Sequence, residues 1–284
     1  MCAFAAVVAG CGSGAKVTGL SVVASTSVYG DLARQIGGSH VSVTSVLTDP
    51  NADPHLFEPG TSNGLAVAHA RVVIQNGLGY DSFMSRLEHA APNAERRVLT
   101  IADILRVHGH DANPHLWYDV RALATVATAI QDAFVRADRP HARAYRRGLA
   151  RFLSSLAPLR RAVAAIRTAH AGAPVAYTEP VPGYLLEAAG LRNLAPSSFT
   201  RPIEEGTEPS AAAVSAMIAL VANRRVQALL YNNQAISPIT ARVLGAARRA
   251  GVAIVAVTET LPPRLSFQQW QLAQVTALRK ALGS

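Results

Sequence analysis

The sequence predicts an α/β protein of two lobes, each with a mostly parallel sheet, joined by a long backbone helix. Three observations predict this class. Short β-branched apolar runs alternate with helical periodicity up to residue 118, a stretch with only helical periodicity follows, and the alternation returns beyond Gly172. Strands that alternate with helices are typical of parallel sheets, because each crossover uses a helix to bring the chain back to the same edge.

The elements of the first lobe follow from its apolar runs. A helix is expected near residues 28–36, and strands are expected at residues 20–24, 41–47, 72–74 and 98–101. These strand segments are rich in valine, isoleucine and leucine, and they are short enough to be strands rather than helices.

The middle of the chain is predicted to be helical. One apolar face contains Val120, Leu123, Ala127, Ile130 and Phe134. A second, longer stripe contains Tyr145, Leu149, Phe152, Leu156, Leu159, Val163 and Ile166. Apolar residues at this spacing line one face of a helix. Asp138-Arg139-Pro140 is expected to separate the two helices, and Pro158 is expected to kink or split the second one near Ser154–Ser155.

The second lobe is predicted from strands at residues 174–177, 226–231 and 252–257, with helices between them. The expected organisation is therefore a signal remnant, lipobox and tether at 1–16, an N-terminal lobe at 17–118, a helical linker at 119–170 and a C-terminal lobe at 171–284.

Composition limits the classes of protein that need to be considered. The 284 residues are 50% hydrophobic, enough for a substantial core, and the formal charge is +9. The arginines are dispersed, with no dense basic run and no interleaved aromatic stripe, so a nucleic-acid partner is not expected. A basic surface also fits contact with anionic lipid headgroups, which suits a tethered protein.

The N-terminus predicts an exported, lipid-anchored protein. A short apolar segment ends in Val8-Ala9-Gly10-Cys11, which resembles a bacterial lipoprotein processing box, and Gly12-Ser13-Gly14-Ala15 follows as a flexible tether. No lysine or arginine precedes the apolar run, which departs from a complete export signal. Cleavage before Cys11 would remove Cys2 and leave a single, lipidated cysteine, so neither a disulfide framework nor thiolate metal ligation is expected.

Two histidine motifs point to one metal site. Asp53-Pro54-His55-Leu56 is echoed by Asn113-Pro114-His115-Leu116. Each proline restricts the local backbone, so each imidazole sits on a stiff segment that loses little entropy when a cation binds. Repetition of the pattern favours paired ligands over two unrelated surface histidines.

The two segments, continued by Phe57-Glu58-Pro59 and Trp117-Tyr118-Asp119, resemble the paired motifs of the zinc- and manganese-binding lipoproteins of bacterial ABC importers, the periplasmic solute-binding protein family 9. The resemblance extends from about Leu20 to about Leu282 and includes residues 75–80 and 183–186. It implies two lobes on a helical backbone and a metal bound between them.

The expected ligands are His55, His115, Glu179 and Glu259. Glu179 and Glu259 each follow a predicted strand, and parallel sheets place binding residues beyond the carboxyl ends of their strands. The resemblance implies the same positions, although prolines around Glu179 depart from the commoner family pattern and the final ligand is usually aspartate. A buried glutamate paired with an arginine is the alternative for Glu179.

Two imidazoles and two carboxylates suit Zn²⁺ or Mn²⁺ as a transported ligand, with zinc favoured and manganese next. Asp53, Glu58, Asp119 and Asn233 are candidates for orienting the ligands, although each also suits a turn or cap. His108 and His110 are expected in an exposed turn. Because imidazole must be neutral to coordinate, metal affinity is expected to fall as the pH drops through about 6.5.

The predicted function is an extracytoplasmic receptor, lipid-anchored at Cys11, that delivers metal to an ABC permease and its ATPase subunit. A monomer without enzymatic activity is expected, because no phosphate-binding loop, nucleophile elbow or zincin helix occurs and four protein ligands leave no open metal position. The alternatives are a zinc-dependent hydrolase, a metal-stabilised surface adhesin, and a receptor for an organic chelate with a wide cleft.

Overall fold

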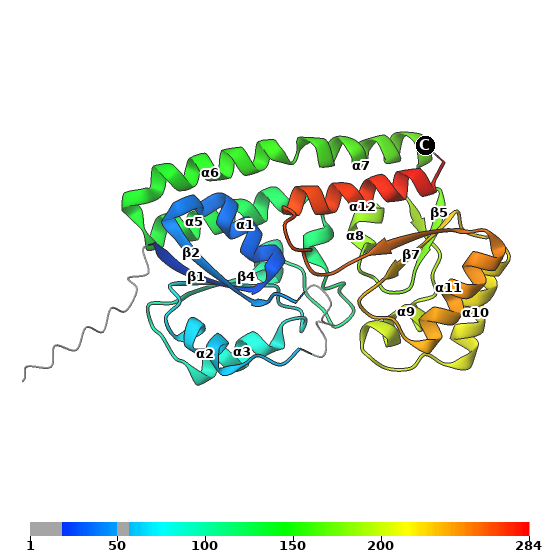
Figure 1. Cartoon of the computed structure of the whole chain (residues 1–284), viewed down its shortest axis with the longest axis horizontal. Helices are drawn as coiled ribbons and strands as arrows, with labels where there is room; N and C mark the ends of the chain where they lie inside the picture. Colours follow the sequence, from blue (N-terminus) through cyan, green and yellow to red (C-terminus); the bar gives the residue numbers. More distant parts are fainter. Residues whose placement is uncertain (1–18, 50–56, 284) are drawn as a thin grey trace, which may run out of the picture.

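Two four-stranded parallel sheets form the centres of the two lobes, as the sequence predicts. The computed structural model describes residues 19–49 and 57–283 (Figure 1). The N-terminal sheet has the order β2-β1-β3-β4, and the C-terminal sheet has the order β6-β5-β7-β8. The strands are β1 Leu20–Thr26, β2 Val41–Leu47, β3 Val72–Gln75, β4 Arg97–Thr100, β5 Pro174–Tyr177, β6 Arg192–Asn193, β7 Ala228–Asn232 and β8 Ala253–Val257.

Helices cover the N-terminal sheet on both faces. They are α1 Ser27–Gly37, α2 Thr61–Ala68, α3 Ser82–Ala90, α4 Ile101–Leu105 and α5 Leu123–Ala137. In β1 and β3 nearly every residue is buried, so neighbouring apolar residues such as Val22 and Val23 face opposite sides of the sheet. Helices α1 and α5 pack on one face, while α2 and α3 pack around Phe83 and Met84 on the other.

The predicted backbone helix is two helices placed end to end, α6 Ala142–Ser155 and α7 Ala157–His170. The break falls at Leu156, beside the expected Ser154–Ser155 position. Pro158 lies in the first turn of α7, where its missing N–H removes no hydrogen bond. Leu156 keeps helical backbone angles, so α6 and α7 run as one long element along both lobes (Figure 1).

The C-terminal sheet is covered by α8 Gly183–Ala188, α9 Ser197–Glu204, α10 Ala211–Ala222, α11 Pro238–Ala250 and α12 Phe267–Ala281. Helices α11 and α12 each begin with a capping box, at Ser237 and Ser266. Although α12 comes last in the chain, it packs on α7 and also contacts α1 of the N-terminal lobe. It therefore spans the two lobes beside the backbone helices (Figure 1).

One apolar core runs through both lobes. Its largest cluster joins the inner residues of β1 and α5 to those of α6, α7, α12 and β7. No helix of the described residues is long and apolar enough to cross a membrane.

Candidate metal centre

The second histidine motif places His115 in the interior, where it faces Glu204 and Glu259 of the other lobe. The His115 side chain is fully buried, and a single helical turn, Leu116–Tyr118, follows it. Asn113 Oδ1 accepts hydrogen bonds from the backbone N–H of His115 at 3.0 Å and from its Nδ1 at 2.8 Å. Because a carbonyl oxygen can only accept, Nδ1 carries the proton and Nε2 of the neutral ring keeps its lone pair for a cation.

Asn113 also connects the two lobes. Its Nδ2 donates to the backbone oxygen of Pro180 at 2.7 Å, and the Tyr184 hydroxyl donates to the backbone oxygen of Asn113 at 2.9 Å. The bond to Pro180 fixes which end of the Asn113 amide faces His115. Gly183 leaves room for this contact, since a Cβ there would lie 2.7 Å from Asn113 Nδ2.

Tyr80 enters the cleft from a left-handed loop after β3. Gly77, Leu78 and Gly79 all have positive φ, at 86°, 56° and 80°. Two glycines make this turn possible without the strain that side chains would add. The Tyr80 hydroxyl donates to Glu259 Oε2 at 3.0 Å, across the interface between the lobes. In the same loop Asn76 Nδ2 donates to the backbone oxygen of Pro114 at 2.9 Å, which fixes the histidine motif.

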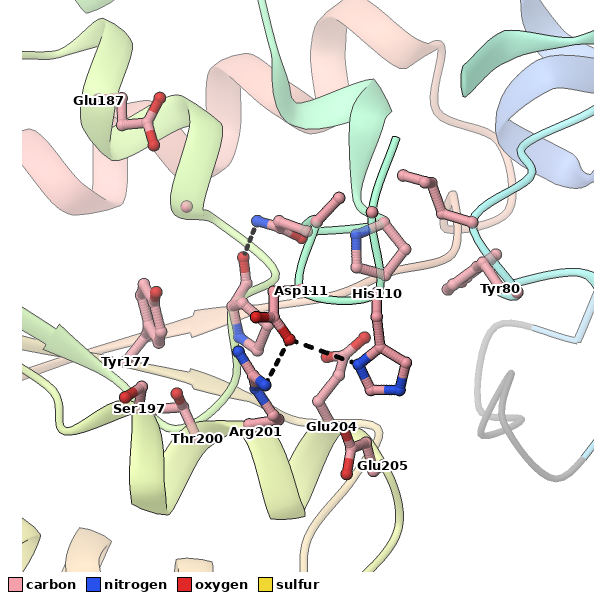
Figure 2. A pocket seen from close by; sticks show the side chains of 18 residues that line it. Tyr80, His110, Asp111, Tyr177, Glu187, Ser197, Thr200, Arg201, Glu204 and Glu205 are labelled. Carbon is pink, nitrogen blue, oxygen red and sulfur yellow. Dashed lines mark hydrogen bonds and ion pairs between the residues drawn. The ribbon is translucent and has the colours of Figure 1, made fainter. Parts of the chain in front are cut away.

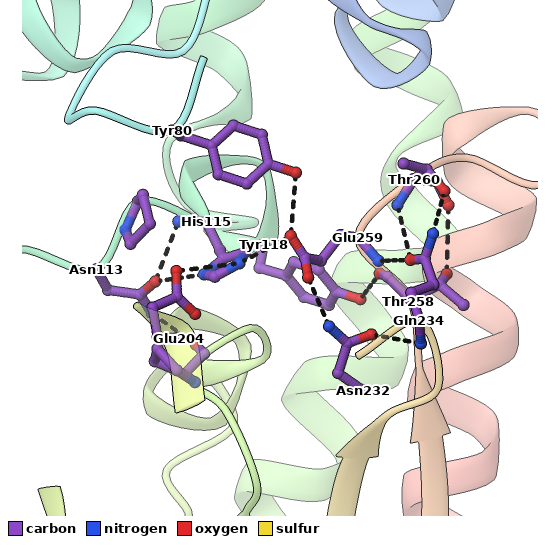
Figure 3. A network of polar contacts seen from close by, with 12 residues as sticks. Tyr80, Asn113, His115, Tyr118, Glu204, Asn232, Gln234, Thr258, Glu259 and Thr260 are labelled. Carbon is purple, nitrogen blue, oxygen red and sulfur yellow. Dashed lines mark hydrogen bonds and ion pairs between the residues drawn. The ribbon is translucent and has the colours of Figure 1, made fainter. Parts of the chain in front are cut away.

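Glu259 follows β8 and faces His115. Asn232 Nδ2 donates to Glu259 Oε1 at 2.5 Å, and Glu259 Oε2 lies 3.3 Å from His115 Nε2. Gln234 Oε1 accepts the backbone N–H of Glu259 at 2.5 Å. Figure 3 shows His115 between the carboxylates of Glu259 and Glu204, with Tyr80 and Asn232 holding Glu259.

Two further carboxylates complete a buried acidic cluster. Glu179, which follows β5, is only 2% exposed, and Glu204, the last residue of α9, lies 3.8 Å from His115 Nε2. Asn232 lies near enough to Glu179 to lower the pKa of that carboxyl, but the Asn232 amide donates its hydrogen bond to Glu259. Neither oxygen of Glu179 therefore receives a hydrogen bond from the described residues. A buried carboxylate in this state needs a proton or a cation.

The charges in the cluster are strongly coupled. Burial, together with the neighbouring carboxylates of Glu259 and Glu204, raises the pKa of Glu179 to about 8. Burial lowers the pKa of His115, but the carboxylates of Glu204, Glu259 and Glu179 outweigh burial and raise it to about 9. The protein therefore concentrates negative charge at one buried point, which a divalent cation would neutralise.

The structure brings three of the four expected ligands, His115, Glu179 and Glu259, to this cluster, one from the N-terminal lobe and two from the other. His55 lies outside the described residues. As they stand, no three His, Cys, Asp or Glu side chains within 19–49 and 57–283 are arranged to hold a metal ion. The set of four ligands therefore stays a prediction.

The orienting residues expected from sequence are distributed differently. Asp53 lies outside the described residues and Glu58 is exposed. Asp119 forms an ion pair with Arg121 at 2.8 Å. Asn233 is also exposed, and its neighbour Asn232, the last residue of β7, makes the contact with the acidic ligand. Strand side chains alternate between faces, so a shift of one residue changes which asparagine faces the cleft.

Three residues that lie in the site were not assigned to it from the sequence. Asn232 satisfied the same strand-end rule as Glu179, so a signal was present. Tyr80 ends a segment that carries the family resemblance, so a signal was present there as well. Glu204 had no such signal, because Glu204-Glu205-Gly206 reads as an exposed helix end.

A cleft of about 790 Å³ leads from the surface toward this cluster. It lies between the loop from Gly109 to Pro114 and helix α9, and its lining includes Glu204. Arg201 on α9 pairs with Asp111 of the loop at 2.5 Å, and His110 Nδ1 lies 3.4 Å from the same carboxylate (Figure 2). His108 and His110 are exposed, as expected. The mouth of the cleft is thus bridged by an ion pair between the lobes.

Comparison with known proteins gives the family and the relatives of this chain. The profile of the ZnuA family, described as "Zinc-uptake complex component A periplasmic", matches residues 22–281. Among curated proteins, a manganese-binding lipoprotein MntA of Halalkalibacterium halodurans is 32% identical over 162 residues, which cover 55% of this chain and 54% of that protein. MntA of Bacillus subtilis is 27% identical over 144 residues, covering 48% and 46%. These alignments span about half the length of the relatives.

Solved structures share the whole fold. The SBP FpvC of Pseudomonas aeruginosa, in complex with Mn²⁺, has a TM-score of 0.78 at 20% identity and covers 93% of this chain and 98% of its own. A crystal structure of ZnuA has a TM-score of 0.73 at 21% identity, with coverage of 93% and 98%. A laminin-binding adhesin of Streptococcus agalactiae has a TM-score of 0.77 at 18% identity, with coverage of 93% and 100%.

Proposed function

Because the chain belongs to the ZnuA family of periplasmic metal-uptake components, we propose that it is an extracytoplasmic receptor for a divalent transition metal. It captures the ion between its lobes and delivers it to the permease and ATPase subunit of an ABC importer. The family consists of binding components of transport systems, not of enzymes, so the hydrolase alternative is not retained.

The observation that carries this proposal is the cluster formed by the buried Glu179 and Glu259 and the partly buried Glu204 beside His115, whose pKa all three carboxylates raise. Burying several carboxylates together is unfavourable unless a cation or protons compensate their charge. The donors come from both lobes, so a bound ion would stabilise the closed arrangement. A receptor whose metal-bound and metal-free forms must differ in shape requires this behaviour.

We propose His55, His115, Glu179 and Glu259 as the ligands. Asn113 fixes the tautomer of His115, and Tyr80 and Asn232 hold Glu259 in place, as groups that support metal ligands commonly do. Trp117 packs edge-on against His115 with ring centroids 5.4 Å apart, which keeps the imidazole in a dry, fixed position.

The preferred metal is the finer part of the proposal. The sequence favours zinc, which is satisfied by four ligands in a tetrahedron. Glu204 adds a further carboxylate beside the site, and additional oxygen donors suit manganese, which accepts six ligands. Relatives named as manganese-binding point the same way. We therefore propose Zn²⁺ or Mn²⁺ as cargo, with Glu204 favouring manganese.

The anchor and the assembly are also proposals. Curated relatives are named lipoproteins, and Cys11, outside the described residues, stands where lipidation is expected. A lipid at this position would keep a monomeric receptor beside its permease, which raises its effective concentration there.

The test is metal content by elemental mass spectrometry on protein purified without added metal, followed by competition titrations of the metal-free form with Zn²⁺ and Mn²⁺. One equivalent of metal is expected. His115→Ala should remove most affinity, and Glu179→Gln should weaken it by removing charge while keeping shape. Glu204→Gln should weaken manganese more than zinc, since it removes an oxygen donor that tetrahedral zinc does not need.

Arg71→Gln provides a matched control, because Arg71 is paired with Glu95 on the surface of the N-terminal lobe and neither residue lines the cleft. Its affinity should equal that of the parent protein. Absence of stoichiometric metal in the parent, or full affinity in His115→Ala, would contradict the proposed site. An equal loss for both metals in Glu204→Gln would leave the receptor function standing but remove the role of Glu204 in selecting manganese.

A further inference from the structure

The outward face of the backbone helices has an unusual charge. From Arg139 to Thr178 the sequence contains no aspartate or glutamate. Helices α6 and α7 carry exposed arginines at positions Arg143, Arg146, Arg147, Arg151, Arg160, Arg161 and Arg167. We call this surface the α6–α7 arginine face.

Helical spacing arranges these arginines in a line. Arg143, Arg147 and Arg151 follow one another at intervals of four residues, and Arg161 continues the line in α7. The opposite side of the same helices is buried, for example at Phe152. From Arg143 to Arg167, the arginine face extends over about 36 Å at 1.5 Å per residue.

Nothing in the described part of the chain neutralises this charge. The ion pairs of residues 19–49 and 57–283 involve other groups, and Arg167 donates only to a backbone oxygen, that of Ala188. Like charges four residues apart on a helix are mildly destabilising, so folding alone gives no reason to place them there. An external anionic partner would give one.

The exposed residues between the arginines favour a partner whose negative charge is spread over a surface. The other exposed residues of the two helices are alanine, serine, threonine and one proline, while the aromatic rings of Tyr145 and Phe152 are buried. Protein interfaces normally need aromatic or apolar anchors, and single-stranded nucleic acids need exposed rings for stacking. A flat surface of phosphate groups needs neither, because guanidinium groups bind phosphate directly.

The position of the face fits a membrane. Gly19, the first described residue, lines a hollow together with Asp138 and His141, immediately before α6. Cys11 precedes it by eight residues, a tether of at most about 28 Å. Helices α6 and α7 lie along one side of the molecule, opposite α9, whose residues line the metal cleft (Figure 1).

We propose that the α6–α7 arginine face rests on the anionic phospholipid surface of the membrane, with the metal cleft turned away from it. The lipid anchor of the proposed function supplies proximity, and the arginine face selects the orientation. In this posture the cleft is open to the medium while metal is being captured. Delivery then requires the receptor to leave the lipid surface and turn toward the permease.

The test uses the full chain with Cys11→Ser, so that no lipid can contribute, and co-sedimentation with vesicles. Vesicles of about 30% phosphatidylglycerol in phosphatidylcholine should bind the protein, and binding should vanish in about 0.5 M salt or on pure phosphatidylcholine. Removing four arginines of the face should lower the partition coefficient at least about tenfold, because each basic residue near an anionic surface strengthens binding several-fold. The variant combines Arg143→Gln, Arg147→Gln, Arg151→Gln and Arg161→Gln.

A matched control removes the same charge from the C-terminal lobe, where four other arginines are also exposed. It combines Arg225→Gln, Arg242→Gln, Arg248→Gln and Arg249→Gln. Binding close to that of the parent is expected for this control. An equal loss in both variants would show that net charge alone is responsible, and would overturn the proposal, as would unchanged binding of the α6–α7 variant. Metal titration and circular dichroism of each variant check that the fold and the cleft are intact.

Orientation is tested separately with a fluorescent label. With Cys2 and Cys11 both replaced by serine, Ser154→Cys places the label on the arginine face and Ser62→Cys places it on α2, on the other side of the molecule (Figure 1). Vesicles should protect the first label from an aqueous quencher but not the second. The opposite pattern would refute the orientation. Neither assay requires bound metal, so failure here is distinct from failure of the proposed metal receptor.

Discussion

Raising the pH should strengthen metal binding and, at the same time, weaken the metal-free protein. In the buried cluster the pKa of His115 is raised to about 9 and that of Glu179 to about 8. At neutral pH the metal-free site therefore holds at least one proton that a cation must displace. An isolated histidine would have lost this proton above about pH 6.5, so the pH range of the effect lies higher than the motif alone predicts.

The stronger metal binding and the lower stability of the metal-free protein both follow from the raised pKa values of His115 and Glu179. Both groups have folded pKa values above their ordinary ones, so the stability that their protonation provides is fully present below the ordinary values. It is lost as the pH rises through about 8 for Glu179 and about 9 for His115. Metal binding releases one to two protons, so affinity should rise about tenfold to a hundredfold per unit between about pH 6 and about pH 8.

The assay is calorimetric titration of the metal-free full chain with Mn²⁺, in buffers of different ionisation enthalpy, which counts the protons released. Thermal unfolding of the metal-free protein across the same pH range measures the effect on stability. The Tm of the metal-free protein should fall as the pH rises, while the increase in Tm on metal binding should become larger. Glu179→Gln should release fewer protons. An affinity that stays within about threefold from about pH 6 to about pH 8, with no proton release, would refute the reasoning.

Three further substitutions test the supporting structure. Gly183→Ala should weaken metal binding about fivefold, because the added methyl group displaces the Asn113 amide from its hydrogen bonds. The Tm should stay unchanged or rise, because alanine favours the helix. Titration curves equal to those of the parent would contradict a role of the Asn113 amide in metal binding. Gly148→Ala should lower stability by about 3 kcal/mol in urea denaturation, since its Cβ would collide with a backbone oxygen of α1; a change below about 1 kcal/mol would contradict the packing. Tyr80→Phe should loosen Glu259 and shorten the lifetime of bound metal, measured by chelator-driven release, and a release rate equal to that of the parent would argue against this hydrogen bond.

The fold was largely predictable because its signals are local. Short apolar runs predicted seven of the eight strands, and only β6, at two residues, was too short to give a pattern. Boundaries moved where adjoining apolar residues belong to loops or helices: β7 begins at Ala228 instead of residue 226, and β4 ends at Thr100 because Ile101 starts α4. Pro158 predicted the division of the backbone helix, since the cause lies in its own ring.

The site was only partly predictable, because its geometry depends on contacts between distant segments. Glu179 and Glu259 were predicted as ligands from their places after strands, and the structure buries both beside His115. The choice of Asn232 over Asn233, by contrast, depends on which way β7 faces the cleft. Glu204 joins the cluster only because α9 approaches the histidine loop, through a contact that spans 89 residues of sequence (204 − 115). Local patterns do not specify such approaches, which arise from tertiary packing.

Helix α12 has a mechanical consequence for how the lobes can separate. Its first turn is fastened to the other lobe, with Phe267 N donating to Asp31 Oδ2 at 2.9 Å and Gln268 Nε2 donating to Gln35 Oε1 at 2.8 Å. The same Gln268 nitrogen lies 2.7 Å from Ser155 Oγ, at the junction of α6 and α7. The first turn of α12 is therefore hydrogen-bonded both to α1 and to the junction of α6 and α7. Bending the molecule at this point must break several of these hydrogen bonds together. Opening of the cleft should therefore be a small, all-or-none movement, and in the proposed function the importer must supply the work that releases the ion.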